Sequence, residues 1–141
     1  MSSFDPETAE NHPDIEKQWA VKALHHAETY FKLISSLDAQ KLKLTKRDDE
    51  LYQDFTLHFP EINVLELDEF NQFKTEQAKS KWREFLKKYE DLPDFNFGTL
   101  LRNRAKEDYG QDNCFFVTRV QFYCIEIARN RLGYNSCHCK K

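Results

Sequence analysis

Two cysteines flank a histidine near the C-terminus, where Cys137, His138 and Cys139 stand in a row. Thiolate and imidazole groups are ligands that zinc prefers, so the segment could hold a metal ion. A structural zinc site needs four ligands, however, and the chain has no second pair at a suitable spacing. We therefore expect free thiols and an ordinary tail. Cys114 and Cys124 are expected to behave as small hydrophobic residues.

Other side chains that could do chemistry lack the partners that catalysis requires. No serine or cysteine nucleophile lies in a recognisable motif near His25 and His26, so we expect His25 in solvent and His26 partly buried and hydrogen-bonded. The acidic pair of Asp48 and Asp49 suits the first turn of a helix. The three glycines of the chain form no phosphate-binding pattern. The sequence therefore predicts a protein that is not an enzyme and has no cofactor or metal.

Residues 12–14 spell His-Pro-Asp, the tripeptide by which J-domain co-chaperones stimulate their ATPase partners. In that domain the tripeptide lies between two helices, but here only eleven residues, largely acidic or small, precede His12. Pro13 fits the first turn of a helix because its missing N–H costs nothing there, and Asp14 complements the positive helix end. We therefore interpret the tripeptide as a helix start that Asn11 or His12 caps.

Hydrophobic residues at intervals of three and four predict the helices that position these side chains. A first helix is expected over residues 15–34. A second is expected over about residues 46–58, where Thr45 begins a variant of the capping box. Thr75 is expected to cap a third helix with apolar positions between Ala78 and Tyr89. A long apolar segment then predicts a last helix over residues 113–133, which a glycine with positive φ ends.

Two short segments rich in branched or aromatic residues, 62–67 and 97–104, predict strands. Helices joined to so few strands indicate an α+β fold. We expect a single compact domain over residues 13–135, with about four main helices packed with a small sheet of two or three strands. Residues 1–12 are expected to be a flexible acidic N-terminus, and residues 136–141 a flexible tail.

The composition favours a packed cytosolic protein. Twelve Phe, six Tyr and two Trp stand among 141 residues, which is enough for one hydrophobic core. No apolar run has the length of a membrane span, and the N-terminus lacks the apolar core of a signal peptide. A formal net charge of -3 excludes no class of partner, because separate acidic and basic faces can sum to a small value.

A basic strip, defined as Lys79, Arg83 and Lys87, repeats every fourth residue of the third predicted helix. Such a strip could contact ribosomal RNA or an acidic protein through long-range attraction. An ordinary solvated helix face is the alternative.

Five blocks of the sequence resemble the eukaryotic family labelled polysaccharide biosynthesis domain-containing. They run in the family's order over about residues 13–135 and read DIEKQWAVKALHHAETYFKLISSLD, LKLTKRDDELYQDF, KWREF, FNFGTLLR and RVQFYCIEIARNRLGYN. No block resembles a sugar-nucleotide site. The resemblance implies a cytosolic, ribosome-associated and ATP-independent chaperone that binds the nascent GTP-binding domain of translation elongation factor 1A. We also expect a monomer without DNA or membrane partners.

Polar residues inside these blocks are the candidates for contact with a partner. Most come from one arc of the last predicted helix, and the set is Arg102, Arg119, Glu126, Arg129, Asn130 and Tyr134. In the alternative interpretation, Arg129 and Glu126 hold the helix to the domain through internal hydrogen bonds. A role in polysaccharide biosynthesis and a generic adaptor that binds protein or RNA are the alternative functions.

Overall fold

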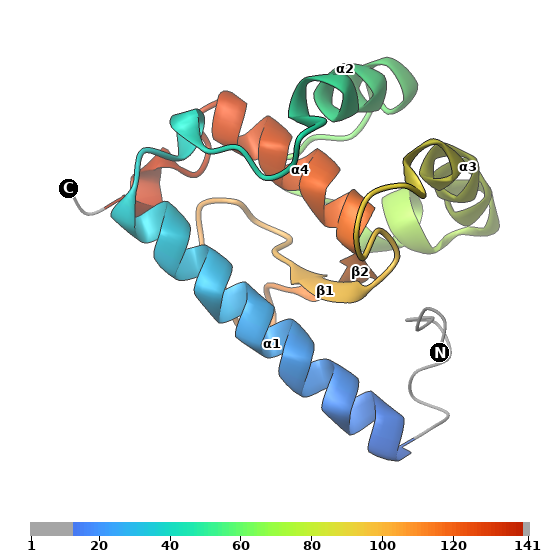
Figure 1. Cartoon of the computed structure of the whole chain (residues 1–141), viewed down its shortest axis with the longest axis horizontal. Helices are drawn as coiled ribbons and strands as arrows, with labels where there is room; N and C mark the ends of the chain where they lie inside the picture. The colour runs from blue at the N-terminus through green and yellow to red at the C-terminus, as the bar shows by residue number, and fades with distance from the viewer. Residues whose placement is uncertain (1–12, 140–141) are drawn as a thin grey trace.

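The computed structural model describes residues 13–139, with side chains from residue 20 onward. Figure 1 shows the helix α4 running through the middle of the molecule, with α1 along one side and α2 and α3 on the other. The main elements are α1 (Pro13–Ser36), α2 (Asp48–His58), α3 (Glu76–Leu86), β1 (Gly98–Leu101), β2 (Phe115–Thr118) and α4 (Arg119–Arg131). The short helices are η2 (Ala39–Lys41), η3 (Phe70–Lys74), η4 (Lys87–Tyr89) and η5 (Ser136–His138).

Helix α1 covers the two-stranded antiparallel sheet. The register of the sheet runs from Gly98 opposite Thr118 to Leu101 opposite Phe115. Ala23 and Ala27 of α1 cluster with Leu100 of β1, and their small side chains let the helix approach the strand closely. The sheet is therefore held between α1 and the rest of the core.

Aromatic side chains fill the core between α2 and α3. The ring of Trp82 stacks on Phe59 with centroids 4.0 Å apart, and Phe73 stacks on the other side at 5.4 Å. The indole Nε1 of Trp82 donates a hydrogen bond to the carbonyl oxygen of Gln72 at 2.9 Å, so the buried ring leaves no unpaired donor. Val120, Ile125 and other residues of α4 belong to the same core, which fixes α4 against both helices.

Polar caps and one glycine set the ends of two helices, and of these the cap at Thr75 and the glycine turn are predicted from the sequence. The Thr75 side chain accepts a hydrogen bond from the backbone N–H of Ala78 at the start of α3. Thr118 and Gln121 form a complete capping box at the start of α4. Beyond the end of α4, Gly133 has a φ of 82°, a conformation that side chains with a Cβ rarely adopt. This turn sends the chain back toward α4.

The expectation of a single compact α+β domain with four main helices and a small sheet is confirmed. The first three predicted helices are present with small changes at their ends. The cap expected from Asn11 or His12 and the segment 1–12 lie outside the described residues. No helix among residues 13–139 combines the length and the apolar character that crossing a bilayer requires.

The predicted single helix over residues 113–133 is wrong in its first part. Residues Phe115–Thr118 form β2, and α4 begins only at Arg119. Phe115 and Val117 are buried while Phe116 and Thr118 are partly exposed, which is the alternation of a strand with two environments. The capping box at Thr118 then marks the change to helix.

The predicted strand over residues 62–67 is also wrong. This segment makes only an isolated bridge between Glu66 and Arg104, with Leu67 N–H donating to the carbonyl oxygen of Asn103. The carbonyl oxygen of Val64 accepts its hydrogen bond from the Arg129 side chain. Backbone pairing with residues 103–105 is thus limited to residues 65–67, and at Val64 a side chain replaces the backbone partner. The predicted strand over residues 97–104 is shorter than expected, at Gly98–Leu101.

Candidate functional site

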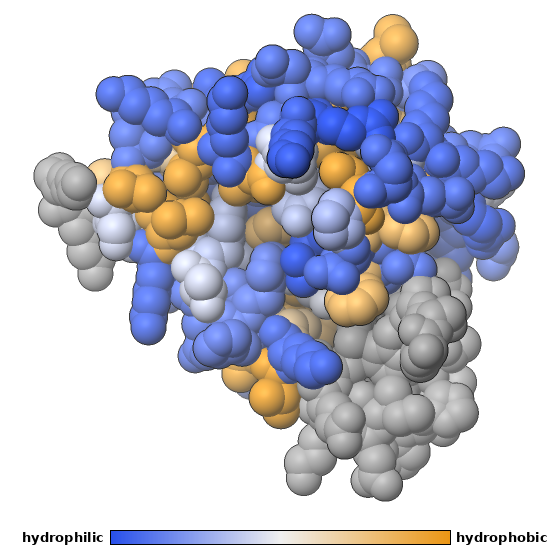
Figure 2. Space-filling view, viewed as in Figure 1, coloured by the Kyte–Doolittle hydropathy of each residue, from blue (hydrophilic) through white to orange (hydrophobic). Residues whose placement is uncertain are grey.

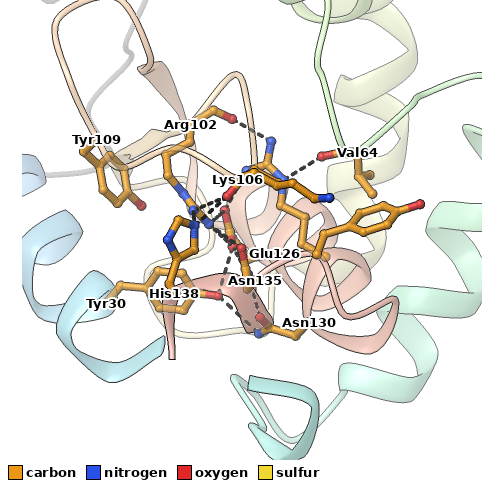
Figure 3. A network of polar contacts seen from close by, with 12 residues as sticks. Tyr30, Val64, Arg102, Lys106, Tyr109, Glu126, Asn130, Asn135 and His138 are labelled. Carbon is orange, nitrogen blue, oxygen red and sulfur yellow. Dashed lines mark hydrogen bonds and ion pairs between the residues drawn. The ribbon is translucent and has the colours of Figure 1, made fainter. Parts of the chain in front are cut away.

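Four of the six predicted partner-binding residues meet in the interior, where they form a buried polar network (Figure 3). Arg102 follows β1, whereas Glu126, Arg129 and Asn130 project from α4. Arg102, Glu126 and Arg129 have an exposed fraction of 0%, and Asn130 has 2%. No partner can therefore touch these side chains while the domain keeps this conformation.

The carboxylate of Glu126 lies at the centre of the buried network. Its Oε1 accepts hydrogen bonds from the Arg102 Nη2 at 3.0 Å, the Asn135 Nδ2 at 2.9 Å and the Tyr30 hydroxyl at 3.0 Å. Its Oε2 accepts from Nη1 of Arg129 at 2.8 Å. Burial alone would raise the pKa of Glu126, but the two guanidinium groups lower it to about 2. The side chain is therefore held as a carboxylate.

The two guanidinium groups tie separate loops to α4. Arg129 donates from Nε to the carbonyl oxygen of Val64 and from Nη2 to that of Arg102, each at 2.7 Å. Arg102 donates from Nη1 to the carbonyl oxygen of Ala105 at 2.7 Å and from Nη2 to Oδ1 of Asn135 at 2.8 Å. Internal hydrogen bonds of Arg129 and Glu126 are the alternative to partner binding that the sequence suggests, and the structure shows such bonds. The charged side chains of α4 therefore hold parts of the domain together.

The buried network contains two cations and one carboxylate. The second positive charge interacts with backbone carbonyl oxygens and with aromatic rings. The Arg102 guanidinium lies 5.5 Å from the ring centroid of Tyr109. Buried ion pairs contribute little net stability compared with hydrophobic side chains, but loss of one partner is costly. The network therefore fixes one arrangement of its loops.

Arg119 and Tyr134, the other two predicted residues, lie outside the buried network and remain partly exposed. Arg119 is the first residue of α4, and Tyr134 follows the turn beyond its end. Thirteen residues of helix rise about 20 Å, so the two side chains belong to opposite ends of α4. The six predicted residues do not form one continuous surface.

An open groove, here called the α1 groove, lies between the second half of α1, the following connection and the first turns of α4. Its volume is about 790 Å³. The lining residues are His26, Thr29, Tyr30, Lys32, Leu33, Ser36, Leu37, Lys43, Leu44, Phe122 and Tyr123. Leu33 and Leu37 are 38% and 39% exposed. Figure 2 shows hydrophobic residues at the surface on this face, including a patch over the C-terminal end of α1.

Tyr30 connects the α1 groove to the buried network. Its ring lines the groove and packs edge-on against Phe122, with centroids 4.9 Å apart. Its hydroxyl donates to Glu126 and accepts a hydrogen bond from Nδ2 of Asn130 at 3.2 Å. Burial and the nearby charge of Glu126 raise the pKa of Tyr30 well above its ordinary value. The neutral side chain of Tyr30 is thus held in the groove by its hydrogen bonds to Glu126 and Asn130.

His26 lines the opposite end of the α1 groove from Leu37. Its Nδ1 lies 2.6 Å from the hydroxyl oxygen of Thr99, and its ring packs edge-on against Phe122. Burial and the charge of Arg119 lower the pKa of His26 to about 4, so the ring is neutral at pH 7. The expectation of a partly buried, hydrogen-bonded histidine is confirmed, and His25 is exposed as expected.

The basic strip and the cysteine-rich tail lie elsewhere. Lys87 pairs with Glu84 at 2.7 Å, while Lys79 and Arg83 border a smaller pocket of about 220 Å³ between α3 and β2. In the tail, η5 places His138 against the ring of Phe31, with centroids 4.9 Å apart. Within residues 13–139 no group of three or more His, Cys, Asp or Glu side chains could hold a metal ion.

Sequence reasoning missed Tyr30 and Asn135 as members of the buried network, and Leu33 and Leu37 as walls of the α1 groove. The two leucines do carry a signal, because they lie outside the main apolar stripe of α1 and predict a second apolar face. Nothing in the local sequence marks Asn135, whose place depends on the turn at Gly133.

Comparisons with known proteins find one family. The family described as PBDC1 protein matches residues 15–140. Protein PBDC1 of Mus musculus is 51% identical over 134 residues, which cover 94% of this chain and 67% of the mouse protein. A PBDC1 homolog of Saccharomyces cerevisiae is 50% identical over 139 residues, covering 96% of this chain and 95% of that protein. This chain spans 57% of the human protein PBDC1, at 49% identity.

A solved structure supports the same relationship. A solution NMR structure of a Saccharomyces cerevisiae protein superposes with a TM-score of 0.85 and 48% sequence identity, covering 100% of this chain and 99% of the other. The family match covers nearly the whole chain, and the blocks quoted above lie within it. From the shared sequence and the shared fold, we conclude that the chain belongs to the PBDC1 family.

Proposed function

We propose that this protein is an ATP-independent, ribosome-associated chaperone in the cytoplasm that binds the nascent GTP-binding domain of translation elongation factor 1A. The identity of the client rests on the family resemblance. The α1 groove is the observation that carries a binding role, because it presents apolar side chains in the open on a rigid floor. The role requires no catalytic group or cofactor, and we propose that a monomer performs it.

A large multi-domain client exposes apolar surface before its domains can close, and such surface aggregates. A binder that covers this surface reversibly lowers the concentration of the aggregating species without ATP. The buried network suits this role, since it holds Tyr30 of the groove in place while Leu33 and Leu37 stay partly exposed. Exposed leucines beside a tyrosine and a phenylalanine offer apolar contact area to such a client surface.

The proposal is tested by diluting denatured elongation factor 1A into buffer without ATP and following light scattering. An equimolar amount of the protein is expected to lower the scattering. A variant with Leu33→Asp should lose the effect, because it places a charge on the wall of the α1 groove. The matched control is Leu57→Asp on α2, since Leu57 is 73% exposed and lies outside the groove. Unchanged scattering with folded wild-type protein would contradict the proposal.

A further inference from the structure

We propose that the α1 groove binds one amphipathic α-helix of its partner, with apolar residues on the buried face and acidic residues at the flanks. The inference depends on the proposed function only in naming elongation factor 1A as the partner. The class of segment is argued from the groove itself.

The walls of the α1 groove favour a helix over an extended strand. One wall is α1 and the facing wall includes the first turns of α4. The backbone groups within α1 and α4 already bond to each other, so these two walls offer no strand edge to which an extended segment could pair. In the connection that also lines the groove, the N–H of Leu44 already donates to Oδ2 of Asp48 at 2.8 Å. A helical segment satisfies its own backbone and needs only side-chain contacts.

The apolar residues of the wall have the spacing that helix packing uses. Thr29 and Leu33 lie four residues apart on α1, and Leu37 follows directly after the helix, where its N–H donates to the carbonyl oxygen of Leu33 at 3.1 Å. The three side chains therefore continue one row about 12 Å long. Leu44 and Tyr123 lie across the groove from this row. A partner helix can place three or four apolar side chains over this length, at positions i, i+3, i+4 and i+7.

The charges at the groove select an acidic partner. Lys32 and Lys43 are the charged residues that line it, and both are exposed. Among the side chains of residues 20–139, no carboxylate lies within ion-pair distance of either ammonium group. His26 adds a neutral ring whose pKa is lowered by burial and by the positive charge of Arg119. Acidic flanks would find complementary charge there, whereas basic flanks would be repelled.

The test measures fluorescence anisotropy with three labelled 18-residue peptides. The first has Leu on one helical face and Glu and Ala elsewhere, the second replaces Glu by Lys, and the third is a scramble of the first. The first peptide is expected to bind at least tenfold more tightly than the other two. Equal affinity for the acidic and basic peptides, or for the acidic peptide and its scramble, would overturn the proposal.

Two variants locate the binding. The double variant Lys32→Glu and Lys43→Glu is expected to lower the affinity for the acidic peptide at least tenfold and to raise the affinity for the basic peptide. The control pair Lys74→Glu and Lys106→Glu changes the net charge equally outside the groove and should leave both affinities unchanged. Circular dichroism confirms that each variant is folded. Equal losses in the two pairs would show that net charge alone attracts the peptide and would overturn the proposal.

The peptide experiment and the aggregation experiment distinguish failure of this inference from failure of the proposed function. Peptide binding with the expected preference, together with no effect on elongation factor 1A, would support the inference and contradict the client. Protection of elongation factor 1A that depends on Leu33, together with no preference among the peptides, would support the client and overturn the inference.

Discussion

The hydroxyl group of Tyr30 donates a hydrogen bond to Oε1 of Glu126 over 3.0 Å, joining residues that are 96 positions apart. One residue belongs to the first helix and lines the α1 groove, and the other lies at the centre of the buried network. The contact explains why polar residues of α4 that no partner can reach still bear on a binding surface, because they set the position of its floor.

Removing only this hydroxyl should cost stability while keeping the shape of the groove. In Tyr30→Phe, the ring still packs on Phe122, but Glu126 and Asn130 each lose a hydrogen-bond partner. We expect unfolding in urea to become easier by about 1–3 kcal/mol. Tyr52→Phe is the control, because the hydroxyl of this partly buried residue makes no hydrogen bond to any residue that the structure describes, and the change should alter stability by less than about 0.5 kcal/mol. Equal losses in the two variants would contradict the role of the Tyr30 hydroxyl.

Neutralising the central carboxylate should be more damaging. Glu126→Gln leaves Arg102 and Arg129 buried without a countercharge, so we expect a loss of about 3–5 kcal/mol in urea unfolding. Glu107→Gln breaks the exposed pair with Arg104 and should cost less than about 1 kcal/mol. A loss below about 1 kcal/mol for Glu126→Gln would mean that the buried network does not hold the fold.

The pH dependence follows from the same carboxylate. The pKa of Glu126 is lowered from 4.5 to about 2 in the folded protein, so the folded state binds this proton less readily than the unfolded state. Its contribution, about 3 kcal/mol, is present above pH 4.5 and is lost as the pH falls toward 2. Urea unfolding at pH 6, 4 and 3 should show this decline. In Glu126→Gln the decline should be smaller, and an equal decline would contradict the assignment.

The turn after α4 should depend on glycine. Gly133→Ala places a Cβ at a φ of 82°, and we expect a loss of about 1–2 kcal/mol in thermal or urea unfolding. The N–H of Tyr134 in this turn donates to the carbonyl oxygen of Arg129 at 2.8 Å, so it should also become less protected from hydrogen exchange. Gly110→Ala is the control, since a Cβ there meets no atom within 4 Å. Similar losses at both positions would argue against a special role for the turn.

Local patterns in the sequence predicted the elements that are themselves local. The apolar stripes located three helices, Thr75 located a cap, and Gly133 located a turn. The strand β2 was missed because its residues continue an apolar run, and periodicity alone cannot divide such a run into strand and helix. The expected strand at residues 62–67 is reduced to one bridge, because only residues 65–67 pair with residues 103–105 and the carbonyl oxygen of Val64 binds the Arg129 side chain.

The sequence offered internal hydrogen bonds of Arg129 and Glu126 only as an alternative interpretation, and it could not name their partners, for a physical reason. Charged residues on an arc of a helix usually face water, so Arg129 and Glu126 suggested a surface. Their burial depends on acceptors that the fold brings from far along the chain, such as the carbonyl oxygens of Val64 and Arg102. The α1 groove likewise depends on the meeting of α1 with α4. The sequence indicates only that Leu33 and Leu37 form a second apolar face.

The most direct test of the account is capture of ribosomes by the tagged protein, followed by sequencing of the messages that they translate. We predict that ribosomes making elongation factor 1A are enriched once the GTP-binding domain has begun to emerge, and that the enrichment survives RNase. Leu33→Asp should abolish it, while Leu57→Asp should not. Ribosomes making elongation factor 1A that are no more abundant than others in the capture would contradict the account.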